Sequence, residues 1–179
     1  MFKLVVALAA SGVSLSACST AFAPGSMQHR GMAGADLTPE QAMPYVMIAG
    51  AGDLYELQSS QLMHQRGRDP RLHRFASMMT DHHSRTTAAT IAAARASGIN
   101  PPPPQLLPMQ RAMLARLQAL NGVAFDLEYL RQQRTAHQMA LALHSHFARA
   151  GNAMPLRSSA ATAVPVVRQH LAQLGGIRI

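Results

Sequence analysis

The stretch from Leu72 to Ala96 constrains the fold more than any other part of the chain. Seven positions there recur at alternating steps of three and four, and they are Leu72, Phe75, Met79, His82, Thr86, Ala89 and Ala93. That spacing places their side chains on one face of an α-helix. A face of this composition packs into a core. The pattern therefore predicts a long amphipathic helix whose core-facing side carries an imidazole, that of His82.

Start and stop signals bound this helix and the one before it. Asp69 precedes a proline and is typical of an N-cap, and Gly98 follows the last apolar position. An earlier helix is expected to start with Thr38 as its N-cap and to run to about residue 66, where Gly67 ends it. Two helices joined by so short a turn form an antiparallel hairpin.

The second half of the chain repeats this organisation after a long connection. Residues 98–122 contain four consecutive prolines, which cannot be helical, and then a short amphipathic segment. Two further helices are expected over residues 123–150 and 155–174, the latter kinked at Pro165. Four long helices with one long crossover predict an all-α, ferritin-like four-helix bundle over residues 38–176, with a short extra helix between its second and third helices.

The N-terminus has the features of an export signal. Residues 1–17 contain Lys3, an apolar run and small residues before Cys18. Leu15-Ser16-Ala17-Cys18 resembles the bacterial lipobox, in which the cysteine is lipidated, with acyl chains such as palmitate. A lone cysteine in an exported chain has no disulfide partner, which agrees with that use. The alternative is an ordinary signal peptide with an incidental cysteine.

Residues 18–37 lack periodicity and are expected to be a flexible tether between the lipid anchor and the bundle. Ser19 after the cysteine resembles the sorting signal for the outer membrane. The expected location is thus the outer membrane, with the domain in the periplasm or at the cell surface. The expected partners are the membrane, through the anchor, and an envelope protein.

The net charge of +8 does not indicate nucleic-acid binding. Sixteen basic residues, of which only Lys3 is a lysine, face eight acidic ones, but the arginines are scattered along the chain. A nucleic-acid interface needs basic residues gathered on one face or along one helix. We therefore expect no nucleic-acid partner.

Histidines and carboxylates on the apolar helix faces are the candidates for chemistry. The candidate ligands of a zinc, iron or copper ion are Glu56, His82, Asp126, His137 and His170. A di-iron centre of the ferritin type needs Glu-x-x-His, which the chain lacks. The bundle core can equally hold a structural polar network without a metal or other cofactor, comprising Glu56, Asp81, His82, His137 and His170. The histidines expected at the surface are His64, His73, His83 and His146, and His144 is left open.

Several segments resemble one bacterial family. They are Asp53 to Leu62, Phe75-Ala76-x-Met78-Met79-x-Asp81-His82, Phe125-Asp126-x-x-Tyr129, the turn around His137, and Val164-Pro165-x-x-Arg168-x-His170-Leu171. They are similar to the domain-of-unknown-function 4142 family, whose members are exported outer membrane proteins with a ferritin-like helical fold. The resemblance implies fold and export, and brings no catalytic residues. The expected function is non-enzymatic, a binding or structural role in the envelope; the alternative is a periplasmic metal-binding protein.

Overall fold

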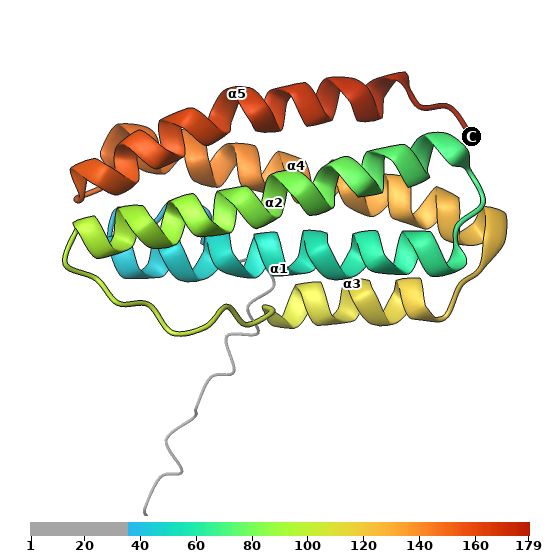
Figure 1. Ribbon diagram of the computed structural model, residues 1–179, viewed down its shortest axis with the longest axis horizontal. Helices are drawn as coiled ribbons and strands as arrows, with labels where there is room; N and C mark the ends of the chain where they lie inside the picture. The colour runs from blue at the N-terminus through green and yellow to red at the C-terminus, as the bar shows by residue number, and fades with distance from the viewer. Residues whose placement is uncertain (1–35) are drawn as a thin grey trace, which may run out of the picture. The chain divides into compact units, whose positions relative to one another are not determined.

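The computed structural model describes residues 36–179, and this part of the chain is helical without any β-strand. Its five helices are α1 (Ala42–Arg66), α2 (Pro70–Ala96), α3 (Pro108–Gln118), α4 (Gly122–Ala150) and α5 (Met154–Gly176) (Figure 1). The all-α class is confirmed for these residues, and so are the predicted helices and the long connection between α2 and α4. The predicted signal, Cys18 and the tether up to residue 35 lie outside the described residues.

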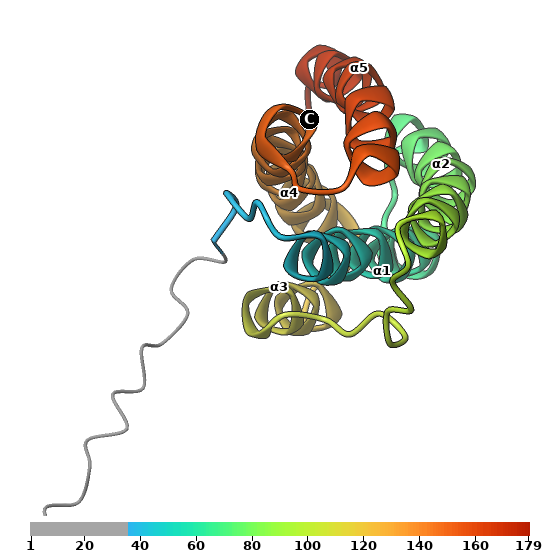
Figure 2. The ribbon, with the colours of Figure 1, turned by 90° about the vertical axis from the view of Figure 1, so that its left-hand side faces the viewer.

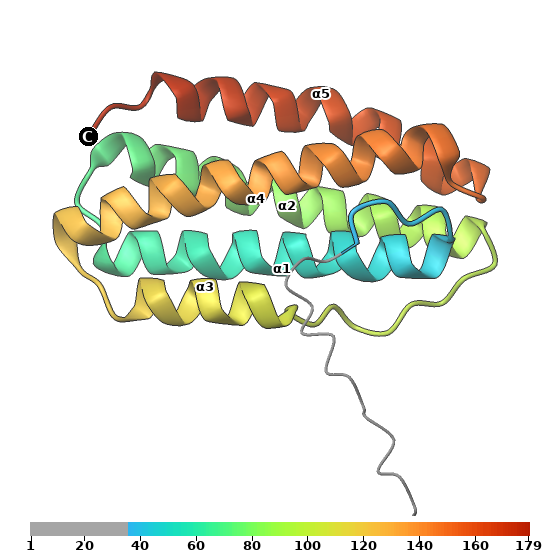
Figure 3. The ribbon, with the colours of Figure 1, turned by 180° about the vertical axis from the view of Figure 1, so that it is seen from behind.

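The helices pack as a bundle built from two hairpins. Helix α1 lies against α2, and α4 lies against α5; α1 also contacts α4, and α2 contacts α5. Seen from one end, these four helices surround a common interior (Figure 2). Helix α3 lies outside, against α1 and α4. The proline-rich segment before it runs back along the bundle (Figure 3). The interior is thus enclosed by α1, α2, α4 and α5.

The sequence predicted the N-cap of α2 correctly and that of α1 incorrectly. The chain leaves α1 at Gly67, and Asp69 accepts a hydrogen bond from the Arg71 amide at 2.8 Å, as expected of an N-cap. The prediction for Thr38 is wrong, because Thr38 bonds to Asp36 and α1 begins at Ala42. The Ala42 amide instead donates to the Asn152 side chain, at 3.0 Å. A residue 110 positions away makes that bond, so local sequence could not reveal it.

The core is divided into two apolar clusters along the bundle. One includes Tyr55, Phe75 and Tyr129, and the other includes Tyr45 and Phe147. On α1, α2, α4 and α5 alike, buried polar residues stand between the positions that serve the two clusters. A buried polar side chain needs a partner, since leaving it unsatisfied costs about 1–3 kcal/mol. This middle layer is therefore where chemistry or a specific network must be sought.

Helix α5 continues through Pro165, which lies inside it, and the predicted kink stays a prediction.

Among the helices of residues 36–179, none combines the length and the apolar character needed to cross a bilayer.

Candidate metal centre

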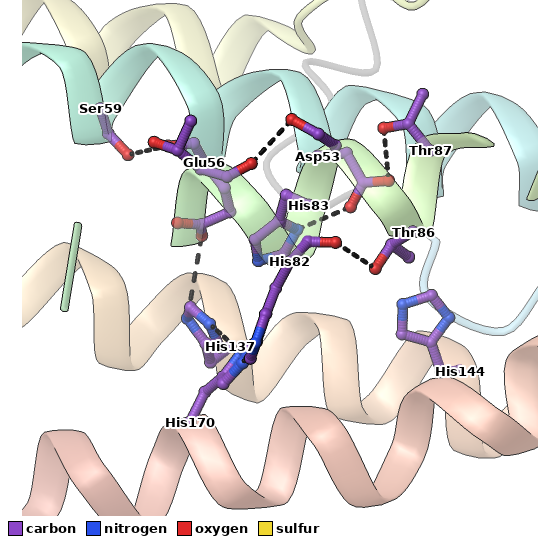
Figure 4. A network of polar contacts seen from close by, with 12 residues as sticks. Asp53, Glu56, Ser59, His82, His83, Thr86, Thr87, His137, His144 and His170 are labelled. Carbon is purple, nitrogen blue, oxygen red and sulfur yellow. Dashed lines mark hydrogen bonds and ion pairs between the residues drawn. The ribbon is translucent and has the colours of Figure 1, made fainter. Parts of the chain in front are cut away.

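Three buried histidines from three helices converge in the middle layer. His83 of α2, His137 of α4 and His170 of α5 each offer one ring nitrogen, and these nitrogens lie within 4.8 Å of one another. Figure 4 shows the three rings pointing into the space between the helices. Imidazoles from facing helices are the usual means by which a bundle builds a metal site. The hydrogen bonds of each ring decide which nitrogen is available.

His83 is held by a carboxylate on the neighbouring helix. Its Nδ1 donates to Asp53 Oδ1 at 2.7 Å, and the other oxygen of Asp53 accepts from the Thr87 hydroxyl at 2.9 Å. The carboxylate therefore fixes the ring orientation and places the proton on Nδ1. The other nitrogen, Nε2, is buried and has no hydrogen-bond partner among the residues described. A metal-binding histidine typically has this arrangement, with a carboxylate behind the ring and an unshared electron pair in front.

His137 is oriented by the backbone of its own helix. Its Nδ1 lies 2.8 Å from the carbonyl oxygen of Gln133. A carbonyl can only accept, so Nδ1 carries the proton and Nε2 carries the electron pair. That Nε2 lies 3.2 Å from Nδ1 of His170. His137 thus presents Nε2 toward the other two histidines.

His170 lies between two other histidines. Its Nε2 is 2.8 Å from Nδ1 of His82, and its Nδ1 faces Nε2 of His137. Because His137 Nε2 accepts, His170 Nδ1 donates, and His170 Nε2 then accepts from His82. The rings of His82 and His170 are stacked, with centroids 5.1 Å apart. His82 is half-buried and stands behind His170 as a second partner, not among the three converging nitrogens.

Glu56 supplies a carboxylate next to the histidines. It is 3% exposed, and its Oε1 lies 3.8 Å from Nδ1 of His137. The second oxygen, Oε2, is buried and accepts no hydrogen bond from the described residues. Glu56 Oε2 is an acceptor, and His83 Nε2 is one too when its ring is neutral, so these two atoms cannot then satisfy each other. A cation or a hydrogen-bond donor beside each of these atoms would satisfy it.

The surroundings keep two of the three imidazoles neutral. Burial lowers the pKa of His170 to about 3, with smaller contributions from His137 and His83. Burial also lowers the pKa of His137, although the charge of Glu56 opposes the shift. His83 differs: burial alone would lower its pKa, but the Asp53 hydrogen bond and the charges of Glu56 and Asp53 outweigh burial and raise it. A neutral imidazole is the form that binds a metal.

The structure brings together some of the predicted site residues and separates others. Glu56, His82, His137 and His170 meet in the middle layer, whereas Asp126 does not. Asp126 accepts from the Arg68 and Asp69 amides in the turn between α1 and α2. Its use as a metal ligand is therefore not supported by its position.

Asp81 was predicted in the network and lies elsewhere. Its side chain is 51% exposed and pairs with Arg85 on the surface of α2. The surface prediction for His83 is also wrong, since His83 is 8% exposed and is one of the three converging histidines. His64 is exposed, and His73 and His146 are half-buried. His144, left open, is buried and bonded to the Tyr45 hydroxyl at 3.0 Å, apart from the three histidines (Figure 4).

Asp53 is the contributor that the sequence did not single out. Its only signal was its spacing, because Asp53 and Glu56 are three residues apart and therefore lie on neighbouring positions of one helical face. In the structure both are buried beside the histidines. The two carboxylates of α1 thus face the histidines of α2 and α4.

Comparison with known proteins shows the family of the chain. The sequence matches the family described as domain of unknown function (DUF4142) over residues 27–177. The chain belongs to the DUF4142 family. The match spans all five helices, so the residues of the middle layer lie within the family's domain. Searches among curated proteins and among solved structures find no match.

Proposed function

We propose that this DUF4142 protein binds one transition-metal ion through His83, His137 and His170, and that zinc is the preferred ion. The observation that carries the proposal is the convergence of three buried ring nitrogens within 4.8 Å. Each ring also has a partner for its other nitrogen: Asp53, the Gln133 carbonyl and His82, respectively. Such second partners orient metal-binding histidines.

The separation of one pair of ligand nitrogens fits a tetrahedral ion. Zinc–imidazole bonds of about 2.0–2.1 Å place two tetrahedral ligands about 3.3 Å apart. The nitrogens of His137 and His170 are 3.2 Å apart. To bind, His170 must move its proton from Nδ1 to Nε2, and His82 must move its own proton from Nδ1 to Nε2, so that His82 Nδ1 accepts the reversed hydrogen bond. Glu56 supplies a buried carboxylate that balances the charge of the ion, and the three histidines leave the fourth position open.

The wider proposal is an exported lipoprotein with a ferritin-like four-helix bundle. The pairing of α1 with α2 and of α4 with α5 supports the bundle arrangement, with α3 as the extra helix of the crossover. The lipobox ending at Cys18 supports anchoring at the outer membrane, with the domain in the periplasm or at the cell surface. Replacing Cys18 by Ala is expected to move the protein from the membrane fraction to the soluble fraction; unchanged membrane retention would contradict the anchor.

Zinc binding is tested directly on the chain from residue 19 to 179. Equilibrium titration against a chromogenic chelator, followed by elemental analysis after desalting, is expected to give one zinc per chain. His83→Gln and His137→Gln are expected to abolish tight binding, whereas His73→Gln, a half-buried histidine outside the cluster, should leave it unchanged. Equal binding by all four proteins would show that the zinc is held elsewhere.

The second candidate is a structural or partner-binding envelope protein without a metal. The two histidine–histidine hydrogen bonds favour it, because His82, His137 and His170 satisfy one another without a ligand. It leaves Glu56 Oε2 and His83 Nε2 unexplained. Absence of zinc binding in the titration, with a folded protein, would favour this function over the first.

A further inference from the structure

A cavity that is open to the surface adjoins the candidate metal centre. Its volume is about 370 Å³, and all three converging histidines and Glu56 line it. Cavities that bind small molecules have volumes of about 300–1,000 Å³. Most of the remaining lining is apolar, with alanine, leucine, methionine and valine side chains from α1, α3, α4 and α5. An apolar ligand in a cavity of this size would gain packing contacts with the side chains that line it.

The three histidines and two carboxylates form one group of polar lining residues. The lining contains further polar residues, which are Arg85, Thr86, Gln110, His144, Ser159 and Thr162. Asp53 and Glu56 come from α1, and His83, His137 and His170 face them. The apolar lining includes Met113, Ala140, Leu143, Ala163 and Val167. A ligand that fits both parts must have one polar head that reaches the metal centre and a body that is apolar. A uniformly polar ligand would leave its own groups unpaired against these side chains.

The cavity reaches the surface between α2 and α5. Thr86 and Ala89 of α2 and Thr162, Ala163 and Val166 of α5 line it, and Ala89 and Thr162 are exposed. Small side chains on both helices leave room for a narrow molecule to enter. An unbranched chain suits such an opening better than a ring system.

We infer that the cavity binds an unbranched acyl chain whose acidic head group coordinates the metal ion at the three histidines. The inference rests on the proposed metal binding. Three protein ligands leave a coordination position for an external ligand. The cationic ion favours an acidic head, and the apolar lining favours the chain. The ligand class is thus a medium-chain fatty acid or a derivative with a comparable head.

The test uses cobalt as a spectroscopic replacement for zinc and two hydroxamates that differ only in chain length. The full mature chain, in detergent, is loaded with Co²⁺, and its visible absorption is followed during titration with acetohydroxamate and with decanohydroxamate. Both should change the cobalt spectrum. Burial of each methylene strengthens binding, so the longer probe is expected to bind at least a hundredfold more tightly.

Matched variants show where in the protein the acyl chain of the probe binds. Ala163→Leu places extra atoms in the cavity and is expected to reduce the preference for decanohydroxamate at least tenfold, with cobalt and acetohydroxamate binding unchanged. Ala88→Leu, an exposed position on α2 outside the lining, is the control. Ala140→Leu is a second cavity variant, from α4, should Ala163→Leu fail to fold.

The outcomes separate the two proposals. If cobalt gives no spectrum that depends on His83 and His137, the metal site is wrong, and the metal-held head group is wrong with it. If cobalt binds but the two hydroxamates bind equally well, the acyl-chain inference is overturned and the metal site stands. A chain-length preference that Ala163→Leu and Ala140→Leu both leave intact would also overturn it.

Discussion

Replacing Asp126 by Ala is expected to destabilise the fold without affecting the metal centre. Asp126 lies near the start of α4 and is 2% exposed. Its carboxylate accepts from the Arg68 amide at 2.9 and 3.2 Å and from the Asp69 amide at 3.0 Å. These two amides belong to the turn that leads into α2. The carboxylate therefore ties the first hairpin to the second.

The size of the effect follows from the bonds that are lost. Each amide left without an acceptor costs about 1–3 kcal/mol when it is buried. Arg68 is exposed and Asp69 is half-buried, so the lower end of that range applies to both amides. Loss of a negative charge near the N-terminus of α2 adds about 0.3–1 kcal/mol. The sum is about 3 kcal/mol, or about 10 °C in Tm for a domain of this size. Asp126→Asn keeps one carbonyl oxygen and should lose about half as much.

Urea unfolding and calorimetry of the two variants measure the loss, and zinc titration of the same samples provides the internal comparison. Zinc affinity should be unchanged, because Asp126 bonds in the turn and does not reach the three histidines. An unfolding midpoint equal to that of the wild type would refute the capping role. A fall in zinc affinity at unchanged stability would show that Asp126 is a ligand, as its sequence position first suggested.

Three more predictions follow from other parts of the structure. Burial lowers the pKa of His144 to about 4. As the pH falls below 6.5 the unfolded state therefore binds a proton before the folded state does, and up to about 3 kcal/mol of the free energy of unfolding is lost by pH 4. Urea unfolding at pH 7 and at pH 4.5 should show a smaller loss of this free energy for His144→Asn than for the wild type. Asp53→Asn removes the carboxylate behind His83 and should weaken zinc binding about 10- to 100-fold in the chelator titration, with the fold retained. Gly67→Ala should lower Tm in a thermal melt, since a Cβ there would overlap the Met63 side chain and lie 2.8 Å from Asp126 Oδ1; an unchanged Tm would show that Met63 moves aside at no cost.

The helices were predictable because their signals are local. The apolar spacing of α2, the N-cap at Asp69 and the glycine after α1 each concern residues within a few positions of one another. The prediction of Thr38 as an N-cap was wrong because the signal that decides it is not local. The N-terminus of α1 is bonded by Asn152 instead, and only the packing of the two hairpins brings Asn152 close to it. The prediction of Asp126 as a metal ligand has the same weakness, because its carboxylate accepts hydrogen bonds from a turn 57 residues earlier in the chain.

The exchange of roles between His82 and His83 shows where sequence periodicity stops being informative. Adjacent residues on a helix point about 100° apart, so only one of them can lie at the centre of an apolar face. His82 fits the spacing of that face and was placed in the core. Helix α2, however, contacts two neighbours, α1 and α5, and its interior side extends from one to the other. His83 faces Asp53 of α1 and is buried, whereas His82 faces His170 of α5 near the edge of the interface and is half-buried. The direction of the interior is set by both neighbours together, and a single helix cannot encode it.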